Sequence, residues 1–390
     1  MNKGKMIFSQ IMEFASPVAF RRSVSKFNGN HKVKDFTCWK QFLCIAFGQL
    51  THRESMSDTM LCLELNPDKL YHLGIGRLVN ISSLSRANES RNWRIFEDFG
   101  IKLIQQAKTL YEGDNQLEVD LKGDIFALDS TTVDLCLEVF WWANFRTTKA
   151  AVKIHTLLDL KTSIPDFIYI SNADVHDVNI LDLISIQKGS YYIMDKAYID
   201  FERLYRIRTE MAFFVVRAKE NMKYKRITSR VPDKDAGIIC DQDILLTGFY
   251  TSQKYPEKLR RIKYHDAEFN ITFVFLTNNF HLKAINVTKL YKHRWYVELF
   301  FKWIKQHLKI KSFWGQNENA VRIQIWVAIS VYLLVAIAKK KQKIEHHTLY
   351  EILQYISVSP FERKPLGEVF LNNGNQEIKE QNINQLKFNL

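Results

Sequence analysis

The segment between residues 121 and 219 constrains the fold more than any other part of the chain. Short runs rich in apolar and β-branched residues, DIFALD (124–129), YYIMD (191–195) and AFFVVRAK (212–219), alternate there with helical patterns such as HDVNILDLISI (176–186). Strands that alternate with helices indicate a mixed sheet that packs against helices. We therefore expect an α/β fold.

Two of these runs end in an aspartate. Ile125, Ala127 and Asp129 share one face of the first run, because side chains alternate along a strand, and Asp195 ends another run in the same way. A carboxylate at the edge of a buried sheet is costly unless it binds a cation or a partner. Two such acids on neighbouring strands would form a divalent metal site, whereas either one alone is equally consistent with a helix cap or a turn.

The sequence changes character on both sides of this segment. Residues 1–85 have helical periods, and residues 1–60 carry nine Lys or Arg against four Asp or Glu. This composition fits a small basic module that binds DNA, for example by a helix-turn-helix, and also a packing or dimerisation domain. The sequence further predicts a connecting helix (86–120), the two parts of a core (121–219 and 286–345), a β-rich insertion between them (220–285) and a C-terminal tail (346–390).

The charge of the chain favours a polyanionic partner. The 55 Lys and Arg exceed the 42 Asp and Glu, which gives a formal net charge of +13 and points to nucleic acid or an anionic membrane surface. Five scattered cysteines without a C-x-x-C pair argue against a zinc knuckle or a disulfide framework. The longest apolar stretch, Ile325–Ala338, is shorter than the roughly 20 residues that span a bilayer. We expect a core helix of a soluble, cytoplasmic protein.

A second charged pattern lies in YKHRWYVELFFKWIKQHLKIK (291–311), which holds six Lys or Arg and one acid. On a continuous helix, at about 100° per residue, one stripe would carry a tyrosine, four cations and the single carboxylate. The members of this stripe are Tyr291, Arg294, Glu298, Lys302, Lys305 and Lys309. A lone carboxylate among cations suits a metal ligand beside a phosphate backbone. The alternative is a solvated helix with an i,i+4 ladder of opposite charges.

These residues resemble the signature of a known enzyme family. Tyr291-x2-Arg294-x3-Glu298-x6-Lys305 is similar to the Y-x2-R-x3-E-x6-K signature of bacterial DDE transposases of the insertion sequence four family. ALDST around Asp129 and MDKAYID around Asp195 resemble the first two catalytic strands of that family, and the resemblance covers nearly the whole chain.

The resemblance implies an RNase H-like mixed-sheet catalytic core with a β-rich insertion and an N-terminal helical domain. Asp129, Asp195 and Glu298 would be the catalytic triad and would bind two Mg²⁺ or Mn²⁺ ions, since carboxylates are hard oxygen ligands. The activity implied is metal-dependent DNA strand cleavage and strand transfer, that is, cut-and-paste transposition of an insertion element.

Five residues are expected to contact DNA. The resemblance implies that Tyr291, Arg294 and Lys305 hold phosphates near the transposon end, and such contacts carry no direct sequence information. Arg217 and Lys219, at the end of AFFVVRAK, would contact phosphate as well, or else form a solvated pair.

The implied partners are the terminal inverted repeats, the target DNA and a second copy of the chain on DNA, in the bacterial cytoplasm and nucleoid. We expect sequence-specific recognition of the ends in residues 1–85. Two alternatives stay open at this point: a catalytically inactive or domesticated DNA-binding regulator, and a related RNase H-like nuclease.

The chain departs from several relatives in one respect. They use a tryptophan of the insertion to stack on a flipped base during hairpin formation, and residues 220–285 contain no tryptophan; Phe249 or Tyr250 would substitute for it. His176 and Asp177, in DVHDVN, would either approach the metals or cap a helix.

Overall fold

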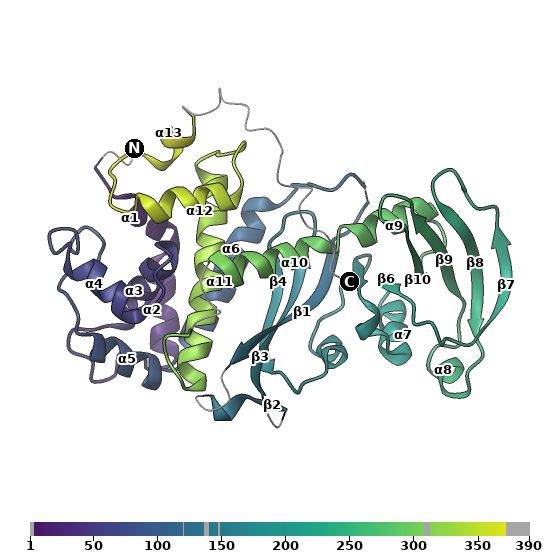
Figure 1. The fold of residues 1–390 in the computed structure, drawn as a ribbon, viewed down its shortest axis with the longest axis horizontal. Helices are drawn as coiled ribbons and strands as arrows, with labels where there is room; N and C mark the ends of the chain where they lie inside the picture. Colours follow the sequence, from purple (N-terminus) through teal and green to yellow (C-terminus); the bar gives the residue numbers. More distant parts are fainter. Residues whose placement is uncertain (1–3, 120, 136–139, 147–148, 308–312, 372–390) are drawn as a thin grey trace. The chain divides into compact units, whose positions relative to one another are not determined.

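The computed structural model describes residues 4–119, 121–135, 140–146, 149–307 and 313–371. The chain divides into two compact units, which are described separately (Figure 1). The helical unit comprises residues 1–110, 307–315 and 319–390, and the sheet unit comprises residues 111–306 and 316–318. The finer division into six parts stays a prediction.

The described part of the helical unit consists of α-helices and one short 3₁₀ helix. The helices are α1 (Ile7–Met12), α2 (Pro17–Lys26), α3 (Cys38–Leu50), α4 (Met56–Glu64), α5 (Ile81–Ser90), α6 (Arg94–Tyr111), α11 (Glu318–Lys341), α12 (Leu349–Val358) and α13 (Leu366–Leu371), with η1 at Glu13–Ala15. Helix α3 begins where the Thr37 hydroxyl accepts a hydrogen bond from the Lys40 N–H at 3.3 Å, a standard N-cap.

Residues distant in sequence share one aromatic core in the helical unit. The ring of Phe20 on α2 lies 5.4 Å from that of Phe42 on α3 and 5.0 Å from that of Phe99 on α6. The Gln49 side chain on α3 donates to the backbone carbonyl of Gln324 on α11 at 3.0 Å. Residues 1–85 therefore share their core with α6 and α11.

The apolar stretch that includes Ile325–Ala338 lies in α11. By length and composition this helix could cross a membrane, yet 94% of its most apolar 18-residue segment is buried inside the protein. The expectation of a core helix is confirmed. Burial of this kind is what a soluble protein shows for its central helix.

The sheet unit is built on one ten-stranded mixed sheet. Its strands are β1 (Ile125–Leu135), β2 (Asn144–Arg146), β3 (Lys149–Asp159), β4 (Pro165–Asn172), β5 (Tyr191–Met194), β6 (Phe213–Arg217), β7 (Tyr224–Arg230), β8 (Ile238–Leu246), β9 (Leu259–Asp266) and β10 (Ile271–Thr277). Its helices are η2 (Trp141–Ala143), η3 (Asp177–Asp182), η4 (Lys196–Tyr198), α7 (Phe201–Thr209), α8 (Phe249–Lys254), α9 (Ala284–Lys292), α10 (Trp295–Lys302) and the π-helical turn η5 (Trp303–His307).

The pairing of the strands changes direction at β1. Strand β1 is antiparallel to β3, and β3 is antiparallel to β4, whereas β1, β5 and β6 run parallel. Strands β10, β9, β8 and β7 extend the sheet beyond β6 by antiparallel pairing (Figure 1). The expected mixed α/β architecture is therefore present, and β7 to β10 form the strand-rich region between β6 and α9.

The helical pattern of residues 176–186 forms in part, as the short 3₁₀ helix η3. Two local expectations from the sequence were wrong. Strand β1 does not end at Asp129 but continues to Leu135, because its second half pairs with β3. Residues 291–307 do not form one continuous helix, since α9 ends at Lys292 and α10 begins at Trp295. Lys309 lies outside the described residues.

Candidate active site

Parallel pairing of β1 with β5 brings two of the predicted acids together. Leu128 is aligned with Met194, so Asp129 and Asp195 each stand one residue beyond an aligned pair at the same end of neighbouring strands. The Asp129 carboxylate accepts a hydrogen bond from the N–H of Ser130 at 2.8 Å. The Asp195 carboxylate accepts from the N–H of Ala197 and caps η4.

The third acid joins this pair through an arginine. Helix α10 lies against β1 and carries Glu298 in its first turn. Arg294, at the N-cap of α10, donates from Nη1 to Asp129 Oδ2 at 2.7 Å and from Nη2 to Glu298 Oε1. The ion pairs of Arg294 therefore connect a residue of β1 to one of α10 across 165 residues of sequence.

Burial and charge shift the titration of this site. Burial raises the pKa of Asp129 to about 6; Arg294 and the Ser130 N–H oppose that shift, and the carboxylates of Glu298 and Asp195 add to it. Burial alone would lower the pKa of Arg294, but the negative charge of Asp129 and Glu298 and the Tyr291 phenol raise it above the ordinary value. The site thus holds more negative charge than one guanidinium balances.

The three carboxylates suit a divalent metal by their chemistry. Asp and Glu oxygens are the ligands that Mg²⁺ and Mn²⁺ prefer. Among the described residues, no three His, Cys, Asp or Glu side chains already stand at ligand spacing, and Arg294 lies between Asp129 and Glu298. The donor set fits such an ion by its chemistry, and the positive charge between Asp129 and Glu298 is that of Arg294.

The remaining signature residues lie around this centre. The Tyr291 ring, at the end of α9, packs on Phe275 of β10 at 4.7 Å and lies 5.8 Å from the Arg294 guanidinium. Burial raises the pKa of Tyr291. Lys305, in η5, donates to the carbonyl oxygen of Thr132 on β1 at 2.6 Å. Both residues therefore brace α9 and η5 against the sheet.

The two predicted phosphate contacts at the end of β6 differ in their surroundings. The Arg217 guanidinium stacks over the Phe273 ring at 5.3 Å, so it is held next to the aromatic group that supports Tyr291. Lys219 is exposed and donates to the Ile199 carbonyl at 3.5 Å. Within the described part of the chain, neither side chain forms an ion pair with a carboxylate, and the solvated-pair alternative stays open for Lys219.

A cavity of about 450 Å³ lies between the segment that follows η4 and the start of α8. Its lining includes Asp200, Lys219, Lys223, Tyr250 and Lys254. Tyr250 and its neighbour Phe249 are each 73% exposed. Three lysines and one exposed tyrosine therefore line this cavity.

His176 and Asp177 have different surroundings. His176 is exposed and its side chain makes no capping hydrogen bond, whereas Asp177 accepts a hydrogen bond from the hydroxyl of Ser130, the residue after Asp129. Lys153 and His155 on β3 also lie near Asp177 and were not predicted from the sequence. A signal for them exists, because these polar residues lie on the same face of the strand as Leu157, a core residue of β3.

Comparison with known proteins identifies the family. A family model described as "Transposase DDE domain" matches residues 120–334, which include all three acids, and a second, "Domain of unknown function (DUF4372)", matches residues 3–76. The chain belongs to the DDE transposase family. It is an insertion-element transposase, an enzyme that cleaves and transfers DNA, and its family depends on a divalent metal.

Named relatives agree with this assignment. "Putative transposase y4zB" of Sinorhizobium fredii is 35% identical over 265 residues, which cover 67% of this chain and 72% of the relative. "Putative transposase for insertion sequence element IS4SA" of Synechocystis is 26% identical over 269 residues, with the same coverage of both chains. Together with the burial of α11, the family indicates a cytoplasmic protein.

The helical unit contains a basic groove and a smaller pocket. A groove of about 650 Å³ runs between the loop that follows α2 and helix α5; its described lining contains five basic or imidazole side chains and no Asp or Glu. These are His31, Lys32, Lys34, Arg86 and Arg91.

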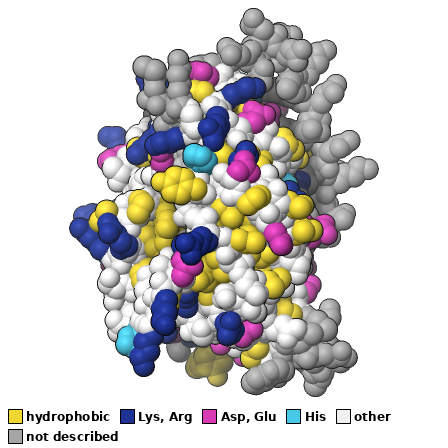
Figure 2. Space-filling view, turned by 90° about the vertical axis from the view of Figure 1, so that its left-hand side faces the viewer, with side chains coloured by type: hydrophobic (Ala, Val, Ile, Leu, Met, Phe, Trp, Pro, Cys, Tyr) yellow, Lys and Arg dark blue, Asp and Glu magenta, His cyan; other side chains and the backbone are white. Residues whose placement is uncertain are grey.

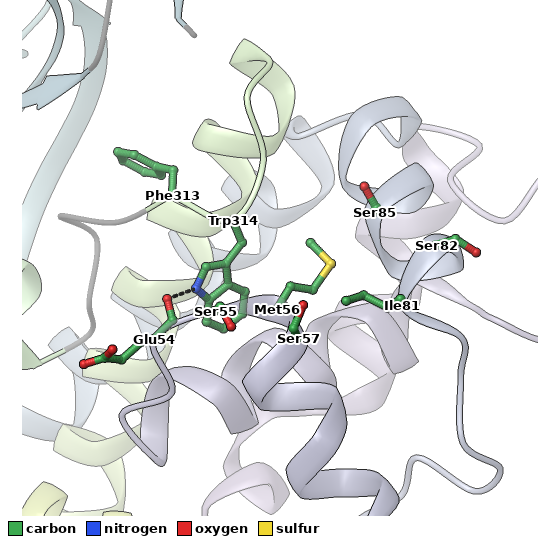
Figure 3. Close-up of a pocket in the computed structure, with 9 residues that line it drawn as sticks. All are labelled: Glu54, Ser55, Met56, Ser57, Ile81, Ser82, Ser85, Phe313 and Trp314. Atoms are coloured by element: carbon green, nitrogen blue, oxygen red, sulfur yellow. Dashed lines mark hydrogen bonds between the residues drawn. The ribbon is translucent and has the colours of Figure 1, made fainter.

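A smaller pocket of about 410 Å³ is lined by serines and by Trp314, whose indole N–H donates to the Glu54 carbonyl (Figure 3).

Proposed function

We propose that this DDE transposase performs cut-and-paste transposition of the insertion sequence four type, with two Mg²⁺ or Mn²⁺ ions held by Asp129, Asp195 and Glu298. The observation that carries the proposal is the register of β1 and β5, which sets the two aspartates side by side. Arg294 supports the inclusion of Glu298, since it binds both Asp129 and Glu298.

The strand order supports an RNase H-like core. The order β4-β3-β1-β5-β6, antiparallel up to β1 and parallel from β1 to β6, agrees with what the family resemblance implies. In such a core the acids at the ends of the central parallel strands and one acid on a later helix meet at one edge. Asp129, Asp195 and Glu298 fulfil these three positions.

The chemistry follows from the charges of the site. Bound divalent cations stabilise negative charge on the attacking and leaving oxygens of a phosphodiester. The chain supplies three carboxylates to hold them, and Asp129 must be ionised to take part. Arg294 is placed to exchange its carboxylate partners for a DNA phosphate when the carboxylates bind cations. Water, and later the freed 3′-hydroxyl, is the nucleophile.

DNA is positioned in the sheet unit by contacts to its backbone. Arg217, Arg294 and Lys219 are the cations that flank the acids, while Tyr291 and Lys305 hold α9 and η5 in place and line the path of the strand. Contacts of this kind fix the register of the DNA and carry no direct sequence information. The lysines that line the cavity between the segment after η4 and α8 extend the same basic path.

Recognition of the element ends belongs to the helical unit. The described lining of the basic groove between the loop that follows α2 and helix α5 contains no acidic residue, which suits a DNA backbone. Helix α5 would then face the adjoining groove of the duplex. Figure 2 looks onto one face of the molecule, on which basic side chains stand among apolar ones. Pairing of two ends requires a homodimer on DNA, assembled at the nucleoid.

The test is a cleavage assay with the full-length protein and a labelled duplex that carries one terminal repeat. Wild type with Mg²⁺ should nick the repeat boundary and join the freed end to a second duplex, and Glu298→Gln should do neither. An inactive regulator would bind the repeat without nicking it, and a nuclease would nick without joining. Either result from the wild type would contradict the proposal.

A further inference from the structure

Behind Asp129, the sheet unit contains a group of polar side chains to which the proposed chemistry gives no role. We call it the Ser130 cluster, and it consists of Ser130, Lys153, His155, Asp177 and Tyr198. Side chains alternate along β1, so Ser130 faces away from Asp129, toward the side on which Leu128 and Tyr198 enter the core. Ser130 is aligned with His155 on β3.

The Asp177 carboxylate lies close to three other members of this cluster, Ser130, Lys153 and His155. The Ser130 hydroxyl donates to Asp177 Oδ1 at 2.7 Å, and the Lys153 ammonium lies 3.3 Å from the same oxygen. Lys153 also donates to the carbonyl of Val175 at 2.9 Å, so it is tied to the loop that leads into η3. His155 is fully buried; its Nδ1 lies 3.7 Å from Asp177 Oδ1. A charged acceptor with several donors holds its partners in a narrow range of positions.

The cluster is linked to both predicted aspartates. The backbone N–H of Ser130 donates to the Asp129 carboxylate at 2.8 Å, so the residue that Asp177 holds also fixes the Asp129 side chain. Tyr198 follows Asp195 by three residues in η4 and is buried. Its hydroxyl is close enough to Asp129, Asp177 and Asp195 for their charges to add to the effect of burial in raising its pKa.

We propose that Asp177 is a positioning residue of the active site: through the Ser130 hydroxyl it holds the Ser130 N–H against Asp129 and so fixes that carboxylate for metal binding. This inference rests on the proposed function, in which Asp129 is a metal ligand. It assigns Asp177 neither metal nor substrate contact. Outer residues that orient a metal ligand typically change metal affinity or activity about 10- to 100-fold when they are lost.

The experiment compares full-length Asp177→Ala, Ser130→Ala and Ser130→Thr with the wild type. Mn²⁺ affinity is measured by calorimetry without DNA, and kcat and KM of end cleavage are measured separately. We expect Asp177→Ala and Ser130→Ala to lower Mn²⁺ affinity and kcat about 10- to 100-fold with KM for DNA unchanged. Ser130→Thr keeps the hydroxyl and should restore both values.

The matched control is Asp182→Asn. Asp182 lies on the same 3₁₀ helix as Asp177 but is half exposed and pairs with Arg203 at 2.6 Å, so its loss should leave Mn²⁺ affinity unchanged. If Asp177→Ala does not fold, Ser130→Ala, which removes one hydroxyl, decides the question. Wild-type Mn²⁺ affinity in Ser130→Ala, or an equal loss in Asp182→Asn, would overturn the positioning role. If Asp129→Ala itself bound Mn²⁺ and cut DNA normally, the proposed function would fail instead.

Discussion

The two units of this chain use their charged side chains in opposite ways. In the sheet unit, Arg294 is mostly buried and neutralised by two carboxylates, so its position is fixed from within. In the helical unit, Lys32 and Arg86 line a groove whose described lining contains no acid. Charges with fixed internal partners suit chemistry that needs defined geometry, whereas charges without an acidic partner suit an external polyanion. The comparison predicts that substitutions in the sheet unit reduce cleavage and that substitutions in the helical unit reduce binding of the DNA ends.

The largest expected effect is loss of cleavage from the acids of the sheet unit. Asp129→Ala, Asp195→Ala and Glu298→Gln should each reduce end cleavage in Mg²⁺ by at least about a thousandfold, since an amide or methyl group cannot replace a hard anionic ligand. Binding of the uncleaved end, measured by gel shift, should stay near the wild-type value. Near wild-type cutting by any one of them would remove that residue from the triad.

The Arg294→Ala variant tests whether a cation that forms ion pairs within the protein also binds a DNA phosphate. Arg294→Ala should slow cleavage about a hundredfold and reduce the salt dependence of DNA binding by about one unit of slope, because a phosphate contact is lost. Lys302→Ala, an exposed lysine on the same helix, is the control and should change neither. If the salt dependence of DNA binding were unchanged in Arg294→Ala, the role of Arg294 would be limited to the ion pairs seen in the structure.

The raised pKa of Asp129 gives a prediction for stability. A carboxyl whose pKa is near 6 in the folded chain and near 3.9 unfolded binds its proton more tightly when folded, so the free energy of unfolding falls as the pH rises from about 4 to about 6. Asp129→Asn removes that titration. Metal-free Asp129→Asn should be about 2 kcal/mol more stable than the wild type at pH 7 and similar at pH 4, as measured by urea unfolding. An equal difference at both pH values would exclude Asp129 as the titrating group.

The same comparison shows what the sequence could predict. Strands around Asp129 and Asp195 and the buried helix α11 could be predicted from local patterns of apolar residues, and all three elements are present. The assignment of the acids as a triad stays a prediction. The course of β1 past Asp129 and the break between α9 and α10 could not be predicted, because both depend on distant residues. Pairing with β3 extends β1, and Asp129 draws Arg294 to the N-cap of α10. The Ser130 cluster likewise exists only once β1, β3 and η3 have come together.

Substitutions in the basic groove are expected to affect recognition of the ends rather than cleavage. Lys32→Ala with Arg86→Ala should weaken binding of the specific end about tenfold and lower the salt slope by about two units, one for each lost phosphate contact. Arg21→Ala, an exposed cation of α2 outside the groove lining, is the control. Substitution is a better test than removal of residues 1–85, because that removal would expose the shared core with α6 and α11. If Arg21→Ala weakened binding equally, the helical unit would contribute only its overall charge.

The smallest expected effect concerns Phe249 and Tyr250, the exposed aromatic pair of the sheet unit. Tyr250 lines the cavity between the segment after η4 and α8 together with three lysines, a combination suited to an unpaired base and its phosphates. Tyr250→Ala should leave first-strand nicking unchanged and slow the second-strand step by about 1 kcal/mol, the lower end of what one stacked base is worth. Tyr250→Phe keeps the ring and should behave as the wild type. Tyr71→Ala removes a comparably exposed tyrosine, 81% exposed in the helical unit, and should alter neither step. Equal slowing of both strands by Tyr250→Ala would show that the pair supports the fold of α8 and would leave end processing to residues nearer the acids.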